Sequence, residues 1–401
     1  MTNQPVNFYG LGIAPQLLET VLKLKFHTPT PIQHQTIPIT LEGKDMIGVA
    51  QTGTGKTMAF GIPMVQRLSI SSQKGRGLIL VPTRELAIQV QASIDKIALP
   101  FGMRTACLIG GDPIHKQIKV LQRLPRIIIA TPGRLIDLIQ QRVVKLADIS
   151  IVVLDEADRM LDMGFAPQIE QIMKTVPKQR QTLLFSATMP QAIVKIAATY
   201  MNFPLQVEIA PPGTTVEAIT HELFIVHKDR KQDLLKKILE KYRGSVLLFC
   251  RTKRGTARMA KALSKMGFRA AEIHSDRSLS QRKEALEGFR IGKYRILAAT
   301  DIAARGIDVT GIELVINYDL PDESENYVHR IGRTGRAGKV GHAISFATPE
   351  ERNDVLSIEK LIKKSLPVSS HPDVPSTEFD KPRVVFSYSS RPRPRGHRRR
   401  R

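Results

Sequence analysis

The sequence has few cysteines, no tryptophan and no long apolar runs. Its only cysteines are Cys107 and Cys250. Two isolated thiols within apolar runs provide neither a disulfide framework nor a zinc site, and they fit a reducing cytosol. No apolar run approaches the roughly 20 residues that a membrane-spanning helix needs. The segment from Met1 to Gly10 lacks the basic and apolar regions of a signal peptide. We therefore expect a cytoplasmic protein that does not enter a membrane.

Acidic residues are also scarce relative to basic ones. The 401 residues include 60 Lys and Arg against 37 Asp and Glu, a formal net charge of +23. An excess of this size predicts attraction to a polyanion such as a nucleic acid. A solvated basic surface without a specific partner is the alternative. An anionic membrane surface fits less well, because no basic amphipathic helix stands out.

Short apolar runs alternate with helix-like segments in two series, which predicts βαβ units, mostly parallel sheets and an α/β fold. We expect a first domain at 1–208, a linker at 209–216 rich in Pro, Gly and Thr, and a second domain at 217–366. Residues 367–401, rich in Pro, Ser and Arg, are expected to form a disordered basic tail. The expected strands are Met46 to Val49, Gly77 to Val81, Thr105 to Ile109, Ile127 to Ala130, Ile149 to Leu154, Leu183 to Ser186, Leu223 to Val226, Val246 to Cys250, Ala270 to Ile273, Ile296 to Ala299, Leu314 to Ile316 and Ile344 to Phe346.

Three carboxylates follow the apolar run that ends at Leu154, where a buried strand of a parallel sheet would end. Ligands of open α/β sheets lie outside the carboxyl ends of the strands. Asp155 is therefore placed to hold a hard cation and Glu156 to handle a water, with Asp158 beside them. Taken alone, this segment also reads as an acidic surface loop.

A glycine-rich loop upstream favours the cation site. It lies between the strand-like run ending at Val49 and a helix-like stretch from Met58 to Leu68, the context of a phosphate-binding P-loop. Its glycines let backbone N–H groups face phosphate oxygens, and the start of the helix adds the positive end of its dipole. Lys56 can reach the outer phosphates, and Thr57 offers a hydroxyl to Mg²⁺. Ala50 stands where the general pattern has glycine. The loop consists of Ala50, Gln51, Thr52, Gly53, Thr54, Gly55, Lys56 and Thr57.

Further polar motifs follow the expected strands in both series. Turn or helix-cap residues are the alternative reading for any one of them. Near the end of the second series, Arg333 and Arg336 lie three residues apart between glycines. They read either as a solvated basic turn or as planar cationic groups aimed at a phosphate across an interface.

Together, these motifs resemble those of the DEAD-box family of ATP-dependent RNA helicases, in order, from about Phe8 to Phe346. The lack of large insertions is similar to compact bacterial members such as the RhlE-like group. The resemblance implies two tandem RecA-like domains facing each other across a cleft, with ATP and Mg²⁺ as cofactors and RNA as the partner of a monomer. It implies RNA-stimulated ATP hydrolysis that separates short RNA duplexes or remodels RNA–protein complexes. An ATP-gated RNA clamp and, less favoured, a DNA helicase remain alternatives.

The resemblance also implies roles for residues at the nucleotide. Phe8 would stack on adenine, Gln33 would recognise the adenine edge, and the P-loop would bind the triphosphate. Asp155 would hold Mg²⁺ through water, and Glu156 would position or deprotonate the attacking water. Asp308 would contact the ribose.

Other implied roles link the nucleotide to RNA. Arg333 and Arg336 would be arginine fingers for the γ-phosphate, so hydrolysis would require domain closure, and ATP and RNA should each tighten binding of the other. Asp158 would bond to Ser186 and Thr188 and couple the ATP site to domain movement. The RNA sugar-phosphate backbone would be held by Thr83, Arg84, Gly111, Thr131, Arg134 and Thr300.

Two positions depart from the family pattern. Lys25 replaces the usual glycine before Phe26, with little expected effect. Leu279 replaces the first residue of the usual Gln-x-x-Arg motif, while Arg282 keeps its place, which puts the contact normally made by that glutamine in doubt. Beyond the motifs, the segment from Arg391 to Arg401 is expected to tether RNA electrostatically, with a merely solubilising tail as the alternative.

Overall fold

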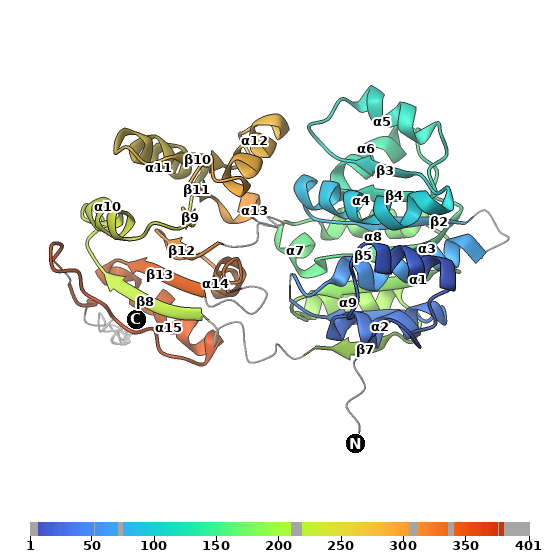
Figure 1. Ribbon diagram of the computed structural model, residues 1–401, viewed down its shortest axis with the longest axis horizontal. Coiled ribbons are helices and arrows are strands. Elements are labelled where there is room, and N and C mark those ends of the chain that lie inside the picture. The colour runs from blue at the N-terminus through green and yellow to red at the C-terminus, as the bar shows by residue number, and fades with distance from the viewer. Residues whose placement is uncertain are drawn as a thin grey trace, which may run out of the picture.

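The computed structural model describes residues 7–51, 53–70, 75–209, 219–304, 312–335, 341–375 and 377–380. They form two α/β domains side by side, the first on the right of Figure 1 and the second on the left. Each domain contains a parallel sheet flanked by helices, as the alternating apolar runs predict. No helix in these residues is long and apolar enough to cross a membrane.

The first domain contains, within the described residues, a seven-stranded parallel sheet in the order β3-β4-β2-β5-β6-β1-β7. The strands are β1 (Met46–Val49), β2 (Arg76–Leu80), β3 (Thr105–Leu108), β4 (Ile127–Ala130), β5 (Ile149–Leu154), β6 (Gln181–Ser186) and β7 (Leu205–Glu208). The helices are α1 (Pro15–Lys23), α2 (Pro31–Leu41), α3 (Lys56–Ile70), α4 (Arg84–Ala98), α5 (Ile114–Leu121), α6 (Pro132–Gln140), α7 (Ala157–Asp162), α8 (Ala166–Thr175) and α9 (Gln191–Tyr200).

The second domain contains a six-stranded parallel sheet in the order β10-β11-β9-β12-β13-β8, again counted within the described residues. The strands are β8 (Ile219–Ile225), β9 (Val246–Phe249), β10 (Ala270–Ile273), β11 (Ile296–Ala299), β12 (Leu314–Asn317) and β13 (Gly341–Ala347). The helices are α10 (Lys231–Lys241), α11 (Lys253–Lys265), α12 (Leu279–Arg290), α13 (Asp301–Ala304), α14 (Ser324–Ile331) and α15 (Arg352–Ile362).

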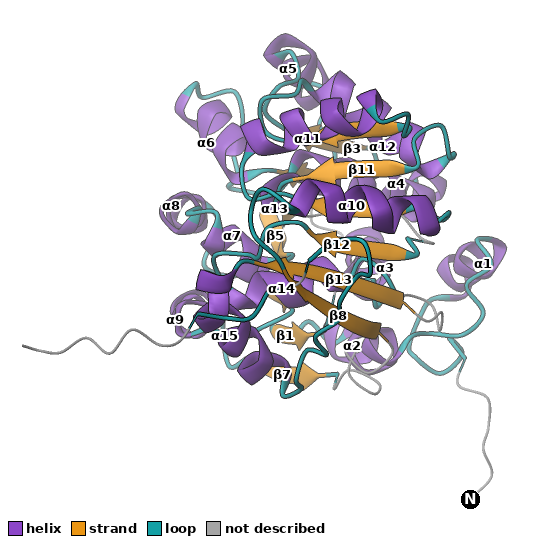
Figure 2. Cartoon of the chain, turned by 90° about the vertical axis from the view of Figure 1, so that its left-hand side faces the viewer, coloured by secondary structure: helices purple, strands orange, loops and turns teal. Residues whose placement is uncertain are grey.

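The two sheets share one topology. Apart from β7, each strand of the first sheet has a counterpart at the same place in the second. Figure 2 turns the second domain toward the viewer and shows its strands lying side by side among the helices. Because all strands of a parallel sheet end at the same edge, the segments that follow them meet there. This shared edge is where the fold gathers the motifs that are far apart in the sequence.

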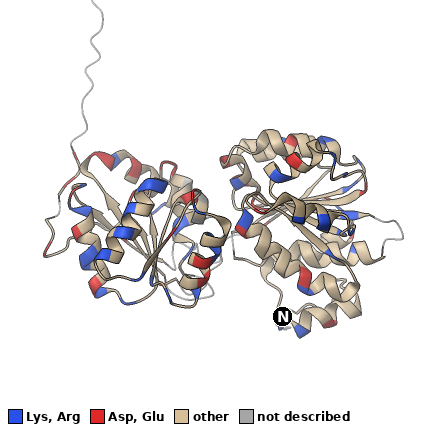
Figure 3. Cartoon of the chain, turned by 90° about the horizontal axis from the view of Figure 1, so that it is seen from above, with Lys and Arg blue, Asp and Glu red and all other residues tan. Residues whose placement is uncertain are grey.

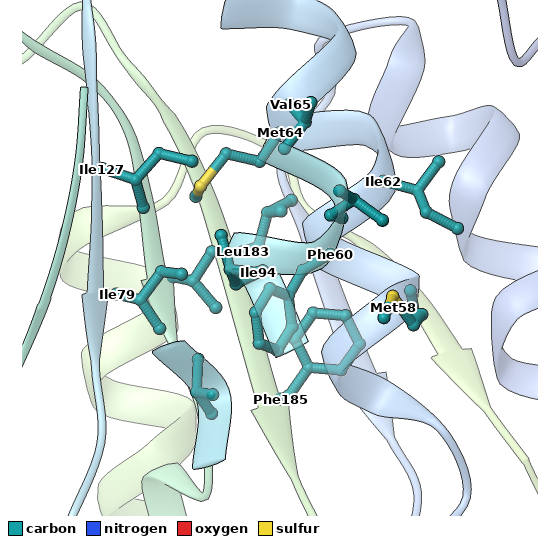
Figure 4. Close-up of a cluster of buried hydrophobic side chains, with 14 of the residues drawn as sticks. Met58, Phe60, Ile62, Met64, Val65, Ile79, Ile94, Ile127, Leu183 and Phe185 are labelled. Carbon is teal, nitrogen blue, oxygen red and sulfur yellow. The ribbon is translucent and has the colours of Figure 1, made fainter. Parts of the chain in front are cut away.

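A buried aromatic pair anchors the strand that leads into the glycine-rich loop. The rings of Phe60 on α3 and Phe185 on β6 lie 5.4 Å apart, centroid to centroid, within the cluster drawn in Figure 4. Gly48 on β1 lies directly against Phe185, because a Cβ at this position would come within 2.7 Å of the ring. Such close approach requires glycine. The loop therefore begins from a strand that is packed tightly against its neighbour.

Three expectations about organisation need correction or lie partly outside the described residues. Strand β7 was not expected, because only Val207 of its four residues is buried and no apolar run marks it. Residues 367–375 and 377–380 were expected to be disordered, but the structure packs them on the second domain: Leu223 N–H donates to the Pro367 carbonyl at 2.8 Å, Thr377 N–H to the Ile225 carbonyl at 3.1 Å, and Asp380 N–H to the Pro349 carbonyl at 3.0 Å. The rest of the tail and most of the expected linker at 209–216 lie outside the described residues.

Basic side chains are spread over both domains. Figure 3 shows Lys and Arg on helices and loops of each domain, with fewer Asp and Glu among them. The positive charge is therefore a property of the folded domains and does not come from the C-terminal segment alone, as expected for a protein that binds a long polyanion.

Candidate active site

The glycine-rich loop joins β1 to α3. Gly53 and Gly55 have φ angles of 88° and 92°, a left-handed conformation that side-chain-bearing residues rarely adopt. Lys56 is the first residue of α3, and its Nζ donates to the Ala50 carbonyl at 2.8 Å from a buried position. Thr54 Oγ1 donates to the Gln51 carbonyl at 2.7 Å. Strand, turned glycine loop and helix N-terminus thus form the phosphate-binding geometry that the sequence predicts. Thr52 lies outside the described residues.

Gln33 connects the start of α2 to this loop. Its Oε1 accepts from Thr30 N–H at 2.9 Å, and its Nε2 donates to the Gly55 carbonyl at 3.0 Å. A Cβ on Gly55 would lie 2.5 Å from that nitrogen, so the glycine is needed for packing as well as for φ. An amide group has a second N–H and a second lone pair. Gln33 therefore retains the capacity to recognise a base while holding the loop.

Two carboxylates lie at the end of β5, where the sequence predicts them. Asp155 and Glu156 are both 3% exposed. Burial raises the pKa of Asp155 to about 7, and the nearby Lys56 ammonium opposes that shift. A buried carboxylate with a raised pKa is stabilised as an anion by a cation, and oxygen donors with several waters suit Mg²⁺. Asp155 and the Thr57 hydroxyl at the start of α3 offer the oxygen donors that Mg²⁺ prefers. No group of three or more His, Cys, Asp or Glu that could hold a metal occurs in the described part of the chain.

Glu156 forms a buried ion pair that the sequence did not reveal. Its Oε2 lies 2.8 Å from Arg159 Nη1, and the two side chains are 3% and 2% exposed. Glu156 also has a left-handed φ of 53°. This strained backbone and the ion pair together fix the carboxylate at the end of the strand.

Asp158 joins the acidic segment to the end of β6. Its Oδ2 accepts from the backbone N–H groups of Ala187 and Thr188 at 3.0 and 2.9 Å and from Thr188 Oγ1 at 3.0 Å. Its own N–H donates to Ser186 Oγ at 3.3 Å. The hydrogen bonds that the resemblance implies among these residues are therefore present. Their coupling role remains a proposal.

Residues of the second domain face this segment. A small cavity between the domains is lined by Arg159 on one side and by Phe249, Asp301, Asn326, His329, Arg330 and Arg333 on the other. Arg330 binds Asp301 through two contacts of 2.6 and 2.7 Å, so its charge is already paired. Arg333 is 3% exposed and lines this cavity at the domain boundary, and its role at the nucleotide stays a prediction. Arg336 and Asp308 lie outside the described residues.

A second, larger groove of about 370 Å³ crosses the boundary near the ends of β2 and β4. Four residues predicted to hold a nucleic-acid backbone line it: Thr83, Arg84, Thr131 and Arg134. The second domain contributes Ser275 and Arg282 to the same groove. Gly111, which follows β3, and Thr300, which follows β11, are not among the residues that line this groove, and their RNA contacts stay predictions.

The start of α4 shapes the floor of this groove. Thr83 caps the helix, because its Oγ1 accepts from Leu86 N–H at 3.3 Å. The Arg84 guanidinium lies over Gly110 and Gly111, where a Cβ would collide with it. Gly111 also has a left-handed φ of 81°. The backbone conformation thus favours glycine at position 111, and both glycines leave room for the Arg84 guanidinium in its present position.

Two contacts between the domains were not predictable from the motifs. Arg282 Nη2 on α12 lies 2.8 Å from Glu85 Oε2 on α4, with the side chains 9% and 4% exposed. Leu279, one helical turn earlier on α12, is 6% exposed and belongs to an apolar cluster whose other buried members all come from the first domain. The position whose contact was in doubt therefore makes an apolar contact with the first domain.

Phe8 does not lie where adenine stacking requires an open ring. It is 1% exposed and is part of the apolar cluster of the first domain, while its neighbour Tyr9 is 62% exposed. Stacking at Phe8 therefore stays a prediction from the resemblance and has no support from its burial.

The structure has two RecA-like domains, a phosphate-binding loop in the first domain, and a groove lined by Thr and Arg at the boundary between the domains. These features define the class of two-domain, nucleotide-driven helicases. Residues 30–196 match the DEAD/DEAH box helicase family, and residues 230–338 match the helicase conserved C-terminal domain. The chain is 44% identical over 360 residues to the DEAD-box ATP-dependent RNA helicase CshA of Geobacillus kaustophilus, covering 90% of this chain and 77% of that protein. The chain therefore belongs to the DEAD-box family of ATP-dependent RNA helicases. This relative's name does not support the RhlE-like subgroup expectation.

Solved structures show similarity over both domains. S. cerevisiae Dbp5 bound to RNA and ADP BeF3 is 31% identical, with a TM-score of 0.82 over 90% of this chain and 95% of that one. A DEAD box protein from Methanococcus jannaschii is 37% identical over 91% of this chain and 99% of its own, but its TM-score is 0.52. By TM-score the present structure is more similar to the Dbp5 structure than to that of the Methanococcus jannaschii protein.

Proposed function

We propose that this protein hydrolyses ATP in an RNA-stimulated reaction and uses the cycle to separate short RNA duplexes or to remodel RNA–protein complexes. The observation that carries the proposal is the shared domain boundary. Arg159, which is paired with the Glu156 carboxylate, and Arg333 of the second domain line one cavity at that boundary, and the groove lined by Arg84 and Arg282 crosses the same boundary. One movement of the domains would thus complete both sites.

Each residue of the nucleotide site has a distinct part in the reaction. Lys56 would turn from the Ala50 carbonyl to the outer phosphates, and the loop N–H groups would bind the remaining phosphate oxygens. Mg²⁺, when held by Thr57 and Asp155, would supply charge stabilisation at the phosphates. Glu156 would hold and deprotonate the attacking water. Arg333 would stabilise the charge that develops on the transferred group, an effect worth roughly 10³ to 10⁵ in rate.

The RNA side of the proposal concerns the backbone. Arg84 and Arg134 are cationic, and Thr83 and Thr131 are short donors suited to phosphate and sugar oxygens. Such contacts carry no sequence information, so intrinsic specificity is expected to be low. The RNA in the Dbp5 structure supports RNA as the partner. Asp158 is hydrogen-bonded to Ser186 and to Thr188. Through these two residues it would transmit the state of the nucleotide to the contacts between the domains.

A second candidate function uses the same residues. An ATP-gated RNA clamp would close on RNA in the same way and use hydrolysis only to set its residence time. Duplex release measured against dwell time on single-stranded RNA separates the two functions. The names of the relatives favour RNA over DNA as substrate, which leaves the DNA helicase as the weakest alternative.

We also propose that the protein acts as a cytoplasmic monomer. Cys107 and Cys250 are free thiols, and burial raises the pKa of each to about 12, so both remain protonated and unreactive. Such thiols are typical of a reducing compartment. Light scattering at several protein concentrations tests the monomer.

The direct test is ATP turnover with RNA, with DNA of the same sequence, and with neither. We expect hydrolysis to rise several-fold with RNA and to change little with DNA. Equal turnover in all three conditions would overturn the proposed function. Omission of Mg²⁺ in the presence of a chelator should abolish turnover, and added Mg²⁺ should restore it.

A further inference from the structure

Helix α12 carries two different contacts between the domains on adjacent turns. Arg282 makes the ionic contact with Glu85, and Leu279 makes the apolar one. Leu279 retains only 6% of its exposure, although no other buried member of its cluster comes from the second domain. Among the described residues, it is thus the second-domain side chain that enters the first domain's core cluster.

The position of this contact is significant for RNA binding. The partner helix α4 begins with the groove residue Arg84, and its cap Thr83 also lines the groove. Glu85, which follows at once, faces α12, and Arg282 lines the groove as well. The first turn of α4 therefore contacts α12 and also lines the RNA groove.

The two contacts respond differently to solution conditions. The Arg282–Glu85 pair is electrostatic, and both of its groups must be desolvated when the domains meet. The Leu279 contact gains free energy from burial alone and is not weakened by moderate salt. An amide side chain such as glutamine, usual in the family at this position, would lack this apolar gain and would have to find hydrogen bonds in the interface.

We propose that Leu279 is a positioning residue that stabilises the closed arrangement of the two domains independently of nucleotide and RNA, and thereby lowers the RNA concentration needed to stimulate hydrolysis. RNA binds to the closed arrangement of the domains. Any interaction that favours this arrangement in the absence of ligand therefore increases the apparent affinity for RNA. Leu279 touches neither nucleotide nor the reacting atoms. Its effect should fall on half-saturation by RNA and leave turnover at saturation unchanged. This inference rests on the proposed function.

The test compares Leu279→Gln with a matched control at the opposite end of the same helix. Ile291 follows the last residue of α12 and is 67% exposed, so Ile291→Gln makes the same kind of change without removing a contact. ATP turnover is measured against RNA concentration for both variants and the unchanged protein. For Leu279→Gln we expect half-saturation to rise about tenfold, because a buried leucine contact is lost, with turnover at saturating RNA within about twofold. Ile291→Gln should match the unchanged protein.

A conservative substitution at position 279 distinguishes loss of the apolar contact from general damage to the fold. Leu279→Met keeps an apolar side chain of similar volume and should restore half-saturation to within about threefold of the unchanged protein. The salt dependence of half-saturation in Leu279→Gln should match that of the unchanged protein, because the lost contact is apolar and the buried ionic contact is retained. If Leu279→Gln leaves half-saturation unchanged, or if Leu279→Met fails to restore it, the inference is overturned.

Failure of this inference is distinguishable from failure of the proposed function. If RNA does not stimulate the unchanged protein, the proposed function fails. If RNA stimulates the unchanged protein and Leu279→Gln behaves identically, only the role of Leu279 fails. Should Leu279→Gln be poorly folded by thermal melting, Leu279→Ala and Leu279→Met provide the same comparison, with half-saturation expected to follow the apolar volume of the side chain.

Discussion

The ion pair between Glu85 and Arg282 should control how readily the domains close. Its N–O distance is 2.8 Å, and its side chains are 4% and 9% exposed. Burial lowers the pKa of Arg282, and the nearby Glu85 carboxylate opposes that shift. Glu85 Oε1 and Arg282 Nε have no hydrogen-bond partner in the structure, so each group relies on the single contact between them. Both groups can return to water when the domains separate.

Replacing Arg282 by glutamine would leave the Glu85 carboxylate buried without a cation in the closed arrangement only. Stranding one partner of a buried pair costs about 3 to 5 kcal/mol. The lower value corresponds to a closing equilibrium that is roughly a hundredfold less favourable. Glu85→Gln should act in the same direction, because it strands Arg282. The double variant should recover at least about tenfold relative to Arg282→Gln, since neither charge is then left alone.

Energy transfer between dyes on the two domains measures closure directly. Cysteines introduced at Leu124 and Leu356, which are 77% and 51% exposed, provide labelling sites away from the interface. The transfer signal is titrated with RNA in the presence of a non-hydrolysable ATP analogue for the four proteins of the cycle. Effects of the two single variants that simply add in the double variant would refute this reasoning, as would an unchanged closing equilibrium in Arg282→Gln.

Three further predictions concern the nucleotide site and the thiols. Lys56→Ala and Glu156→Gln should each abolish ATP turnover, while the Glu156→Gln variant should still close on ATP and RNA. Normal RNA-stimulated hydrolysis in Glu156→Gln would contradict the role of Glu156 at the attacking water. Arg333→Ala should lower turnover by roughly 10³-fold or more with a modest loss of ATP affinity in an equilibrium titration, and an unchanged rate would mean that the second domain does not complete the site. Burial raises the pKa of Cys107 to about 12. At pH 8 its alkylation should therefore be roughly a thousandfold slower than that of an unfolded thiol, and a native rate equal to that in guanidinium would contradict this burial.

The sheets and the nucleotide loop could be predicted because local sequence determines them. The buried strands β4 and β5 read as continuous β-branched runs, and the observed bounds agree with the expected ones. The glycines at 53 and 55 mark positive φ angles, which few other residues adopt. The three carboxylates after β5 lie at a parallel strand end, where the topology alone makes a ligand site.

The contacts between domains could not be predicted in the same way. Glu85 and Arg282 are separated by 197 positions in the sequence, and each side chain alone reads as an ordinary charged residue on a helix. Leu279 reads as a helix residue of its own domain. Only the placement of α12 against α4 reveals that these side chains are buried together. The Glu156–Arg159 pair was missed because a spacing of three on a short helix does not distinguish a buried pair from a solvated one.

Composition misled the prediction for residues 367–380. The Pro, Ser and Arg content of the C-terminal segment favours disorder, yet backbone hydrogen bonds, which depend little on side chains, hold residues 367–369 and Thr377 against β8. Phe8 was placed at the nucleotide by the resemblance, and adenine stacking there stays a prediction. Its ring is buried in the apolar cluster of the first domain.

The segment after residue 366 has a consequence for how this protein is made. Strand β8 lies at the end of its sheet, and its outer side is occupied where Leu223 pairs with Val368. An unpaired strand edge is a template for aggregation through strand addition by another copy of the chain. The covering segment follows every strand of this sheet in the sequence, so the edge of β8 is covered only after all six strands have been synthesised. Residues 367–369 therefore protect β8 from pairing with another copy of the chain.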